Sequence, residues 1–221
     1  MTQRIACADG AHRDKAVAAA LAAVRRGDLV VIPTESVYAV ATDAFSRRGV
    51  AALREAKGYD EQVPLPVLVG ARATLGGIAL RVSDEARDLV EAFWPGPLTV
   101  LLRPQPTLAW DLPDDAPLAV RMPLHPVAVA LLAQSGPLVA TTANAPGQLA
   151  PADVDEALVQ LGDGVSLALD AGSLVDDVGL PSTIVDLTGS VPRVVRTGAI
   201  SLEQVRAICP HALAEDDPVT A

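Results

Sequence analysis

Polar side chains that could bind an anion follow two apolar runs of the sequence, at the points where those runs end. Thr34 and Glu35 follow the run 29–32, and Thr142 and Asn144 follow a second such run. Their oxygen and amide groups can hold a small zwitterion or a phosphate, although such residues equally often cap a helix or close a turn. Open α/β sheets bind their ligands at strand ends, which is where these residues are expected to lie.

Three basic residues could supply the positive charge that an anion requires. Lys57 ends a predicted helix, where it can also simply complement the helix dipole. Arg121 ends an apolar strand, and a buried arginine requires a carboxylate or phosphate partner, from the protein or from a ligand. Arg196 lies two residues before Gly198, and Ser182 precedes a further strand. Residue chemistry by itself indicates an α/β enzyme with an anion-binding face.

Other kinds of site have little support. Neither G-x-x-x-x-G-K-[ST] nor G-x-G-x-x-G occurs, no Ser/His/Asp constellation is convincing, and the scattered histidines do not suit a metal. Cys7 and Cys209 lie near opposite ends without CxxC spacing, which predicts reduced thiols. The net charge of −10 argues against strong direct nucleic-acid binding, but not against one small nucleotide. Without an apolar leader, or a run of about 18 apolar residues, we expect a cytoplasmic protein with no membrane contact.

The spacing of apolar residues predicts the elements that must position these groups. Strands separated by helices of about ten residues indicate an α/β fold, and the close spacing of the last strands predicts hairpin pairing and a mixed sheet. We expect one domain over residues 1–209 and a disordered acidic tail over 210–221. The predicted helices are 14–26, 47–57, 83–93, 126–134, 154–161 and 202–208, and the predicted strands are 29–32, 65–69, 98–102, 118–121, 137–140, 166–169, 183–187 and 193–196. Pro66 predicts an edge or a bulge for its strand.

Seven motifs in the same order resemble those of the YrdC-like threonylcarbamoyl-AMP synthase family, over roughly residues 14–208. One such motif would be weak evidence, but seven collinear ones strongly indicate the fold. They are PTESVYAVATD at 33–43, KGYDEQVPL at 57–65, WPGPLT at 94–99, VRMPLHP at 120–126, TANAPG at 142–147, STIVDLT at 182–188 and RTG at 196–198.

The resemblance implies an α/β fold with a curved mixed sheet, helices packed around it and a concave cavity. It implies an L-threonylcarbamoyladenylate synthase, a nucleotidyltransferase that makes threonylcarbamoyl-AMP and pyrophosphate from L-threonine, bicarbonate and ATP. The product would pass to a downstream tRNA threonylcarbamoyl transferase for the N6-threonylcarbamoyladenosine modification of tRNA. Mg²⁺ is expected with ATP.

The resemblance also implies roles for particular residues. Lys57 and Arg121 would be catalytic, because one anion must attack another and the charge must be neutralised. The threonine site would comprise Thr34, Arg121 and Ser182. The ATP site would comprise Lys57, Thr142, Asn144 and Arg196.

The motifs depart from the family pattern at several positions. Tyr59 stands where the K-x-R motif has its arginine, and tyrosine cannot replace that fixed cation. Either Lys57 and Arg196 suffice, or Arg54 supplies the missing charge, or the chain is a specialised paralogue that uses another amine or carbamoyl donor. A non-catalytic nucleotide or RNA binder is a further alternative. The other departures are Val63, Ala39, Ala41, Ala150 and Ala152, and the two alanines at 39 and 41 could constrain the backbone.

Overall fold

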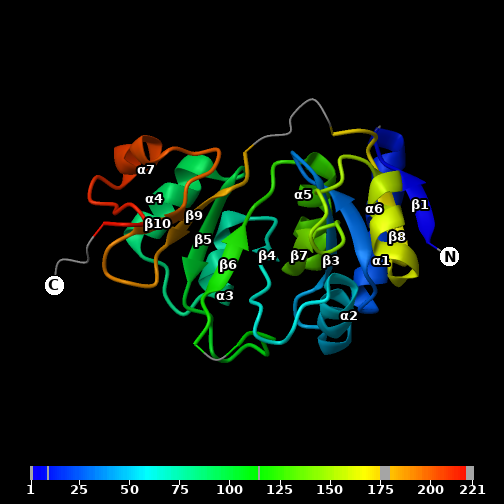
Figure 1. Ribbon diagram of the computed structural model, residues 1–221, viewed down its shortest axis with the longest axis horizontal. Helices are drawn as coiled ribbons and strands as arrows, with labels where there is room; N and C mark the ends of the chain where they lie inside the picture. The colour runs from blue at the N-terminus through cyan, green and yellow to red at the C-terminus, as the bar shows by residue number, and fades with distance from the viewer. Residues whose placement is uncertain (1, 9, 114, 175–179, 218–221) are drawn as a thin grey trace.

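The fold is built on one ten-stranded mixed sheet, in the order β1-β8-β2-β3-β7-β4-β6-β5-β9-β10 (Figure 1). It is seen in a computed structural model that describes residues 2–8, 10–113, 115–174 and 180–217. The strands are β1 Gln3–Ala6, β2 Val30–Pro33, β3 Tyr38–Asp43, β4 Val67–Leu68, β5 Leu98–Leu102, β6 Leu118–Arg121, β7 Leu138–Thr142, β8 Leu167–Asp170, β9 Thr183–Asp186 and β10 Arg193–Arg196. The helices are α1 Gly10–Arg25, α2 Arg47–Lys57, α3 Leu75–Ile78, α4 Asp84–Phe93, α5 Pro126–Ser135, α6 Val154–Leu161 and α7 Leu202–Ile208.

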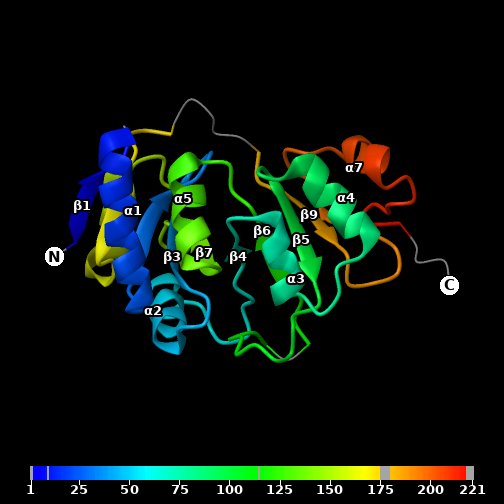
Figure 2. The ribbon, with the colours of Figure 1, turned by 180° about the vertical axis from the view of Figure 1, so that it is seen from behind.

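Helices cover both faces of the sheet and give it two cores. Helices α1 and α5 pack against each other on one face, and Figure 2 shows them from that side. Residues of α2, α4, α6 and α7 belong to the other core. Strand β2 serves both, because Val30 and Ile32 join the first core and Val31 joins the second. A strand buried on both faces must be continuously apolar, as this one is.

The predicted α/β class and the mixed sheet are confirmed. Strands β9 and β10 form the expected antiparallel hairpin, whereas β9 runs parallel to β5 and β8 runs parallel to β2. Helices α2 and α6 have the predicted bounds. Ser83, where the predicted helix 83–93 begins, caps α4 by accepting from the N–H of Ala86.

Two strands were not predicted. Strand β3 follows β2 after a four-residue turn and pairs with it antiparallel, with Pro33 opposite Tyr38. The run after Pro33 was interpreted as a ligand-binding loop or helix cap, so its second half was not recognised as a strand. Strand β1 has no alternating apolar pattern because it is a largely exposed edge strand, held parallel to β8.

The prediction for Pro66 was wrong, and the tail differs from expectation over its described part. The two-residue strand β4 lies inside the sheet between β7 and β6, and Pro66 precedes it. In the tail, Ala212 is buried, and Leu213 donates to the carbonyl oxygen of Pro192 at 2.9 Å. Arg193 donates to the carbonyl oxygens of three tail residues, Ala214, Glu215 and Asp217, which offsets the poor apolar content up to residue 217. Residues 218–221 lie outside the described residues.

Candidate functional site

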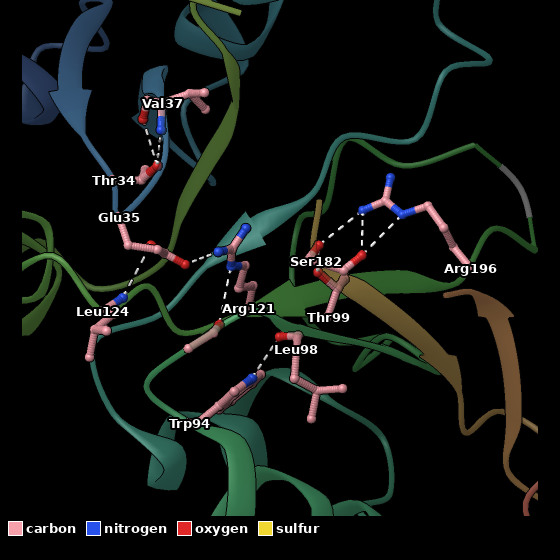
Figure 3. Close-up of polar contacts among 11 residues, drawn as sticks. Thr34, Glu35, Val37, Trp94, Leu98, Thr99, Arg121, Leu124, Ser182 and Arg196 are labelled. Atoms are coloured by element: carbon pink, nitrogen blue, oxygen red, sulfur yellow. Dashed lines mark hydrogen bonds and ion pairs between the residues drawn. The ribbon is translucent and has the colours of Figure 1, made fainter. Parts of the chain in front are cut away.

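Arg121, at the end of β6, forms an ion pair with Glu35. Its Nη2 donates to the Glu35 carboxylate, and its Nε donates to the carbonyl oxygen of Gly96 at 3.2 Å (Figure 3). The backbone N–H of Leu124 donates to the other carboxylate oxygen of Glu35 at 3.3 Å. Only 20% and 18% of the two side chains are exposed. The partner that a buried arginine requires is therefore a carboxylate of this chain.

Ser182, directly before β9, joins Arg196 to Thr99. Nε and Nη2 of Arg196 donate to the carbonyl oxygen of Ser182 at 3.0 and 2.8 Å, and Nη2 also donates to its Oγ at 2.9 Å. The same Oγ lies 2.9 Å from Oγ1 of Thr99. Figure 3 shows the remaining guanidinium nitrogen, Nη1, directed away from Ser182. Two of the three guanidinium nitrogens are thus fixed, and the third is oriented by them.

A close backbone approach at Gly198 holds Arg196 in this position. A Cβ atom at 198 would lie 2.0 Å from the carbonyl oxygen of Pro181. Oγ1 of the buried Thr183 accepts from the N–H groups of Gly198 and Ile200, at 2.9 and 3.0 Å, and donates to the carbonyl oxygen of Ile200. Any side chain at position 198 would collide with this backbone, so glycine is required two residues after Arg196.

The two arginines raise the positive potential at this end of the sheet. Burial, together with the smaller effect of the nearby charge of Arg196, lowers the pKa of Arg121 to about 10. Burial also lowers the pKa of Arg196. Both guanidinium groups remain charged at neutral pH, so a bound anion would relieve their repulsion.

Thr34 has a local partner for its hydroxyl. Its Oγ1 donates to the carbonyl oxygen of Val37 at 2.5 Å and accepts from the N–H of the same residue at 3.4 Å. These bonds close the turn between β2 and β3, and the residue is only 8% exposed. The structure therefore shows Thr34 shaping the turn that presents Glu35.

Lys57, the last residue of α2, lies under the loop that follows β7. Its Nζ donates to the carbonyl oxygen of Thr142 at 2.8 Å, to Oδ1 of Asn144 at 2.8 Å, and to the carbonyl oxygen of Asn144. The residue is 1% exposed, and burial lowers its pKa to about 8. The lysine predicted to hold a phosphate is directed at protein oxygens.

Asn144 organises the same loop. Its Oδ1 also accepts from Oγ1 of Thr142, and its Nδ2 donates to the carbonyl oxygen of Gln148 at 2.7 Å. The N–H of Ala145 donates to Oε1 of Gln160, on α6, at 2.8 Å. The structure thus brings together Lys57, Thr142 and Asn144, three of the four residues of the implied ATP site, whereas the fourth, Arg196, bonds to Ser182.

The β2–β3 turn connects the two groups of side chains. Glu35 contacts Arg121, and three residues later the carbonyl oxygen of Tyr38 accepts from the N–H of Ala143 at 2.9 Å. Three residues of chain span at most about 11 Å. The Arg121–Glu35 pair and the loop after β7 therefore both contact one short segment of the chain. Tyr38 also accepts from the N–H of Ala171 through its own hydroxyl. Glu35 was considered from the sequence as a possible ligand group and not as the partner of Arg121, and Tyr38 was given no role, although both lie within the first motif.

A protein-family model described as "Telomere recombination", for the Sua5, YciO and YrdC proteins, matches residues 22–198. The chain belongs to the Sua5/YciO/YrdC family.

Relatives of this family resemble the chain over different shares of their length. A Mycobacterium tuberculosis protein is 44% identical over 209 residues, covering 94% of this chain and 95% of that protein, and its name assigns it provisionally to the threonylcarbamoyl-AMP synthases. The threonylcarbamoyl-AMP synthase of Bacillus subtilis is 31% identical over 198 residues, covering 88% of this chain and 57% of that protein. The structure of Pyrococcus abyssi Sua5 complexed with L-threonine matches with a TM-score of 0.86 and 27% identity, over 100% of this chain and 66% of that one.

Within this Sua5/YciO/YrdC fold, Arg54 does not supply the cation that Tyr59 lacks. Its Nη1 donates to the carbonyl oxygens of Asp60 and Val63 at 2.6 and 2.8 Å, and its Nε pairs with Asp111 at 3.2 Å. With 6% exposure, its guanidinium is held between the 60–63 turn and Asp111. The alternative in which this arginine replaces the motif cation was therefore wrong.

The alanines of the first motif face the core. Ala39 and Ala41 lie in β3 and belong to the cluster beneath α1 and α5. Each occupies a regular position of the ladder, opposite Thr142 and Ala140 of β7. The backbone constraint that was considered for these alanines is therefore not required by the structure.

Other features of the described residues limit where further chemistry can occur. A cavity of about 750 Å³ is lined by Arg81, Arg103 and Ser190 among others, and none of the candidate site residues lines it. Nδ1 of His125 accepts from the N–H of Val127 and caps α5.

In the part of the chain that the structure describes, no three His, Cys, Asp or Glu residues cluster as metal ligands. Among the same residues, no helix has the length and apolar character needed to span a bilayer.

Proposed function

We propose that this protein is an L-threonylcarbamoyladenylate synthase, a nucleotidyltransferase that forms threonylcarbamoyl-AMP and pyrophosphate from L-threonine, bicarbonate and ATP. In this reaction the threonine amine takes up bicarbonate with loss of water. An oxygen of the resulting carbamate attacks the α-phosphorus of ATP, and the bond to pyrophosphate breaks. The proposal is supported by the names of the family relatives and by the convergence of Arg121, Ser182 and Arg196 at one end of the sheet.

The paired arginines suit the electrostatic demand of this reaction. An anionic carbamate must approach an anionic phosphate, so preorganised positive charge contributes most of the stabilisation available to the protein. Arg121 would hold the threonine carboxylate after exchanging its bond to Glu35. Arg196, oriented by Ser182, would present Nη1 to a phosphate oxygen. The Ser182 hydroxyl would complete the threonine site.

The loop after β7 is the proposed nucleotide site. Thr142 and Asn144 end a strand and begin a loop whose shape is fixed by hydrogen bonds from Lys57, Gln160 and within the loop. Mg²⁺ would accompany ATP. Glu35, a carboxylate of the candidate site, is paired with Arg121, and the described residues hold no cluster of metal ligands, so they suit a metal held by the triphosphate and water rather than by a protein cage.

The proposal includes a cellular setting. We expect the protein in the cytoplasm, where ATP and bicarbonate are present and its product can reach a tRNA threonylcarbamoyl transferase. The net charge of −10 favours handing over a small product rather than direct tRNA binding.

A second candidate is a family member that uses another amine or carbamoyl donor. Tyr59 and Val63 favour it, because each departs from the family motif, and so does the Glu35 carboxylate on Arg121, because it occupies the expected carboxylate position. Screening amino acids, simple amines and carbamoyl phosphate separates the two candidates.

Pyrophosphate release tests the proposal. Purified protein with ATP and Mg²⁺ should release pyrophosphate only when both bicarbonate and L-threonine are present. Arg121→Met should abolish this release, and Arg87→Met, at an exposed arginine of α4, should leave it unchanged. Release that does not require threonine would exclude threonine as the substrate.

A further inference from the structure

Strand β5 carries one hydroxyl in an otherwise apolar run. Its sequence is LTVLL, and Thr99 is 6% exposed between the buried Leu98 and Val100. Burying a hydroxyl costs free energy unless the group is hydrogen-bonded, whereas valine would fill the same space without that cost. Thr99 ends the WPGPLT motif, and no role was assigned to it from the sequence. The presence of a hydroxyl at this position therefore requires an explanation.

Thr99 lies between the residues proposed to bind threonine. In the sheet it is directly opposite Arg121 of β6 and, on its other side, opposite Ile184 of β9. Side chains at paired positions of neighbouring strands point to the same face of a sheet. Ser182 lies two residues before Ile184, and its Oγ is 2.9 Å from Oγ1 of Thr99 (Figure 3). The hydroxyl of Thr99 thus belongs to the same face as Arg121 and contacts Ser182.

The hydrogens of the two hydroxyl groups can be arranged in two ways. A hydroxyl has one proton to donate and two lone pairs that accept, whereas a guanidinium can only donate. Nη2 of Arg196 therefore occupies one lone pair of the Ser182 Oγ. Either Ser182 donates its proton to Thr99, or Thr99 donates its proton to the second lone pair of Ser182.

Only the second arrangement leaves no buried proton unpaired once a substrate oxygen is bound. Among the described residues, Oγ1 of Thr99 has no hydrogen-bond partner besides Ser182. If Ser182 donated to it, the proton of Thr99 would be buried in the sheet without an acceptor, which is unfavourable. If Thr99 donates, both lone pairs of Ser182 are occupied and its own proton remains for the ligand. Ser182 is then restricted to donating.

We propose that Thr99 is a positioning residue of the threonine site, because its hydroxyl donates to Ser182 and so leaves the Ser182 proton for an oxygen of the amino acid. This inference rests on the proposed function, which places the amino acid at Ser182. Accepting two hydrogen bonds, one of them from a guanidinium, also polarises the Ser182 hydroxyl and makes it a stronger donor. The ammonium of a substrate finds no acceptor in this hydroxyl, so the amine lies elsewhere in the site.

Urea unfolding of ligand-free protein tests the bond itself. Thr99→Val and Ser182→Ala each remove one hydroxyl of the pair, and the double variant removes both. If the hydroxyls bond to each other, the change in unfolding free energy in the double variant should differ from the sum of the two single changes. Additive changes would overturn the proposal, whether or not the protein has the proposed activity.

Calorimetry with L-threonine and a non-hydrolysable ATP analogue tests the positioning role. Thr99→Val should bind L-threonine at least about fivefold more weakly, which corresponds to the loss of one hydrogen bond. Its affinity for the ATP analogue should change by less than about twofold, because Arg196 keeps both bonds to the carbonyl oxygen of Ser182. Thr99→Ser keeps the hydroxyl and should restore most of the L-threonine affinity. Thr107→Val, at an exposed threonine after β5, is the matched control and should change neither affinity.

The two ligands separate a positioning role from a general loosening of the fold. Equal losses for L-threonine and the ATP analogue, or no recovery in Thr99→Ser, would overturn the proposal. If the unmodified protein binds the ATP analogue but not L-threonine, the proposed function fails, and with it the assignment of the Ser182 proton to the amino acid. The unfolding experiment would in that case still decide whether Thr99 holds Ser182.

Discussion

The guanidinium of Arg121 and the carboxylate of Glu35 bind each other where the proposed threonine carboxylate would lie. Glu35 is tethered there by the N–H of Leu124 and by the Thr34 turn. A substrate carboxylate must therefore displace a carboxylate of the protein. The exchange of one anion for another keeps the charge at Arg121 nearly constant.

Glu35→Gln should lower the KM for L-threonine. Removing the competing charge frees Arg121, and a partly buried ion pair of about 1 kcal/mol corresponds to a change of about fivefold. Steady-state pyrophosphate release at saturating ATP measures the effect. Glu91→Gln, at an exposed residue of α4, is the control. An increase in KM would instead show that Glu35 itself binds the substrate, for example at its amine.

Gly198→Ala should destabilise the protein and weaken the Arg196 site together. The added Cβ collides with the carbonyl oxygen of Pro181, and such overpacking costs about 1–3 kcal/mol of unfolding free energy. Urea unfolding measures the stability, and the KM for ATP reports the site. Gly189→Ala, where no atom lies within 4 Å of the added Cβ, should change neither. Unchanged stability in Gly198→Ala would contradict the close approach.

Stability and nucleotide affinity should respond to pH in opposite directions above pH 8. Burial lowers the pKa of Lys57 from 10.5 to about 8, so between these values the unfolded chain binds a proton that the folded chain does not. The free energy of unfolding should therefore rise with pH across this window, by about 3 kcal/mol in total from this group. Nucleotide affinity should fall over the same window, because a neutral amine donates fewer hydrogen bonds to the loop.

The difference between the unmodified protein and Lys57→Met isolates this lysine from other titrating groups. Unfolding at several pH values and calorimetric titration with the ATP analogue give the two profiles. Parallel profiles for protein and variant would show that Lys57 does not titrate in this range.

Arg54→Met should lower stability without a selective effect on ATP. The variant leaves the carbonyl oxygens of Asp60 and Val63 without their donor, and removing one partner of a buried charged network costs about 3 kcal/mol. Affinities for AMP and the ATP analogue should keep their ratio. A loss confined to the ATP analogue would instead make Arg54 a phosphate ligand.

Much of the fold was predictable because local chemistry and tertiary structure agree. Helix α2 begins at a serine cap and ends at a left-handed glycine, and both signals are visible in the sequence. Strand β3 was missed because the motif that contains it was interpreted as a loop. Its pairing with β7 is a long-range contact with no local signature.

The bonds that the candidate site residues form could not be predicted from the sequence. Arg121 was expected to need an anion, and it has one in Glu35, but no spacing rule selects that partner from residues 86 positions away. From its spacing Lys57 was expected to complement the helix dipole, and from the family resemblance it was expected to hold a phosphate; neither expectation implied that it would be buried. Its burial follows from the loop that closes over α2, which only the folded chain shows.

Incorporation of [¹³C]bicarbonate tests the central claim most directly. The protein is incubated with ATP, Mg²⁺, L-threonine and labelled bicarbonate, and the products are analysed by mass spectrometry at once. We predict an adduct of threonine and AMP that carries one ¹³C, appears with one equivalent of pyrophosphate, and is absent from Arg121→Met. ATP consumption without a labelled threonine adduct, or a labelled adduct of a different amine in its place, would contradict the assignment.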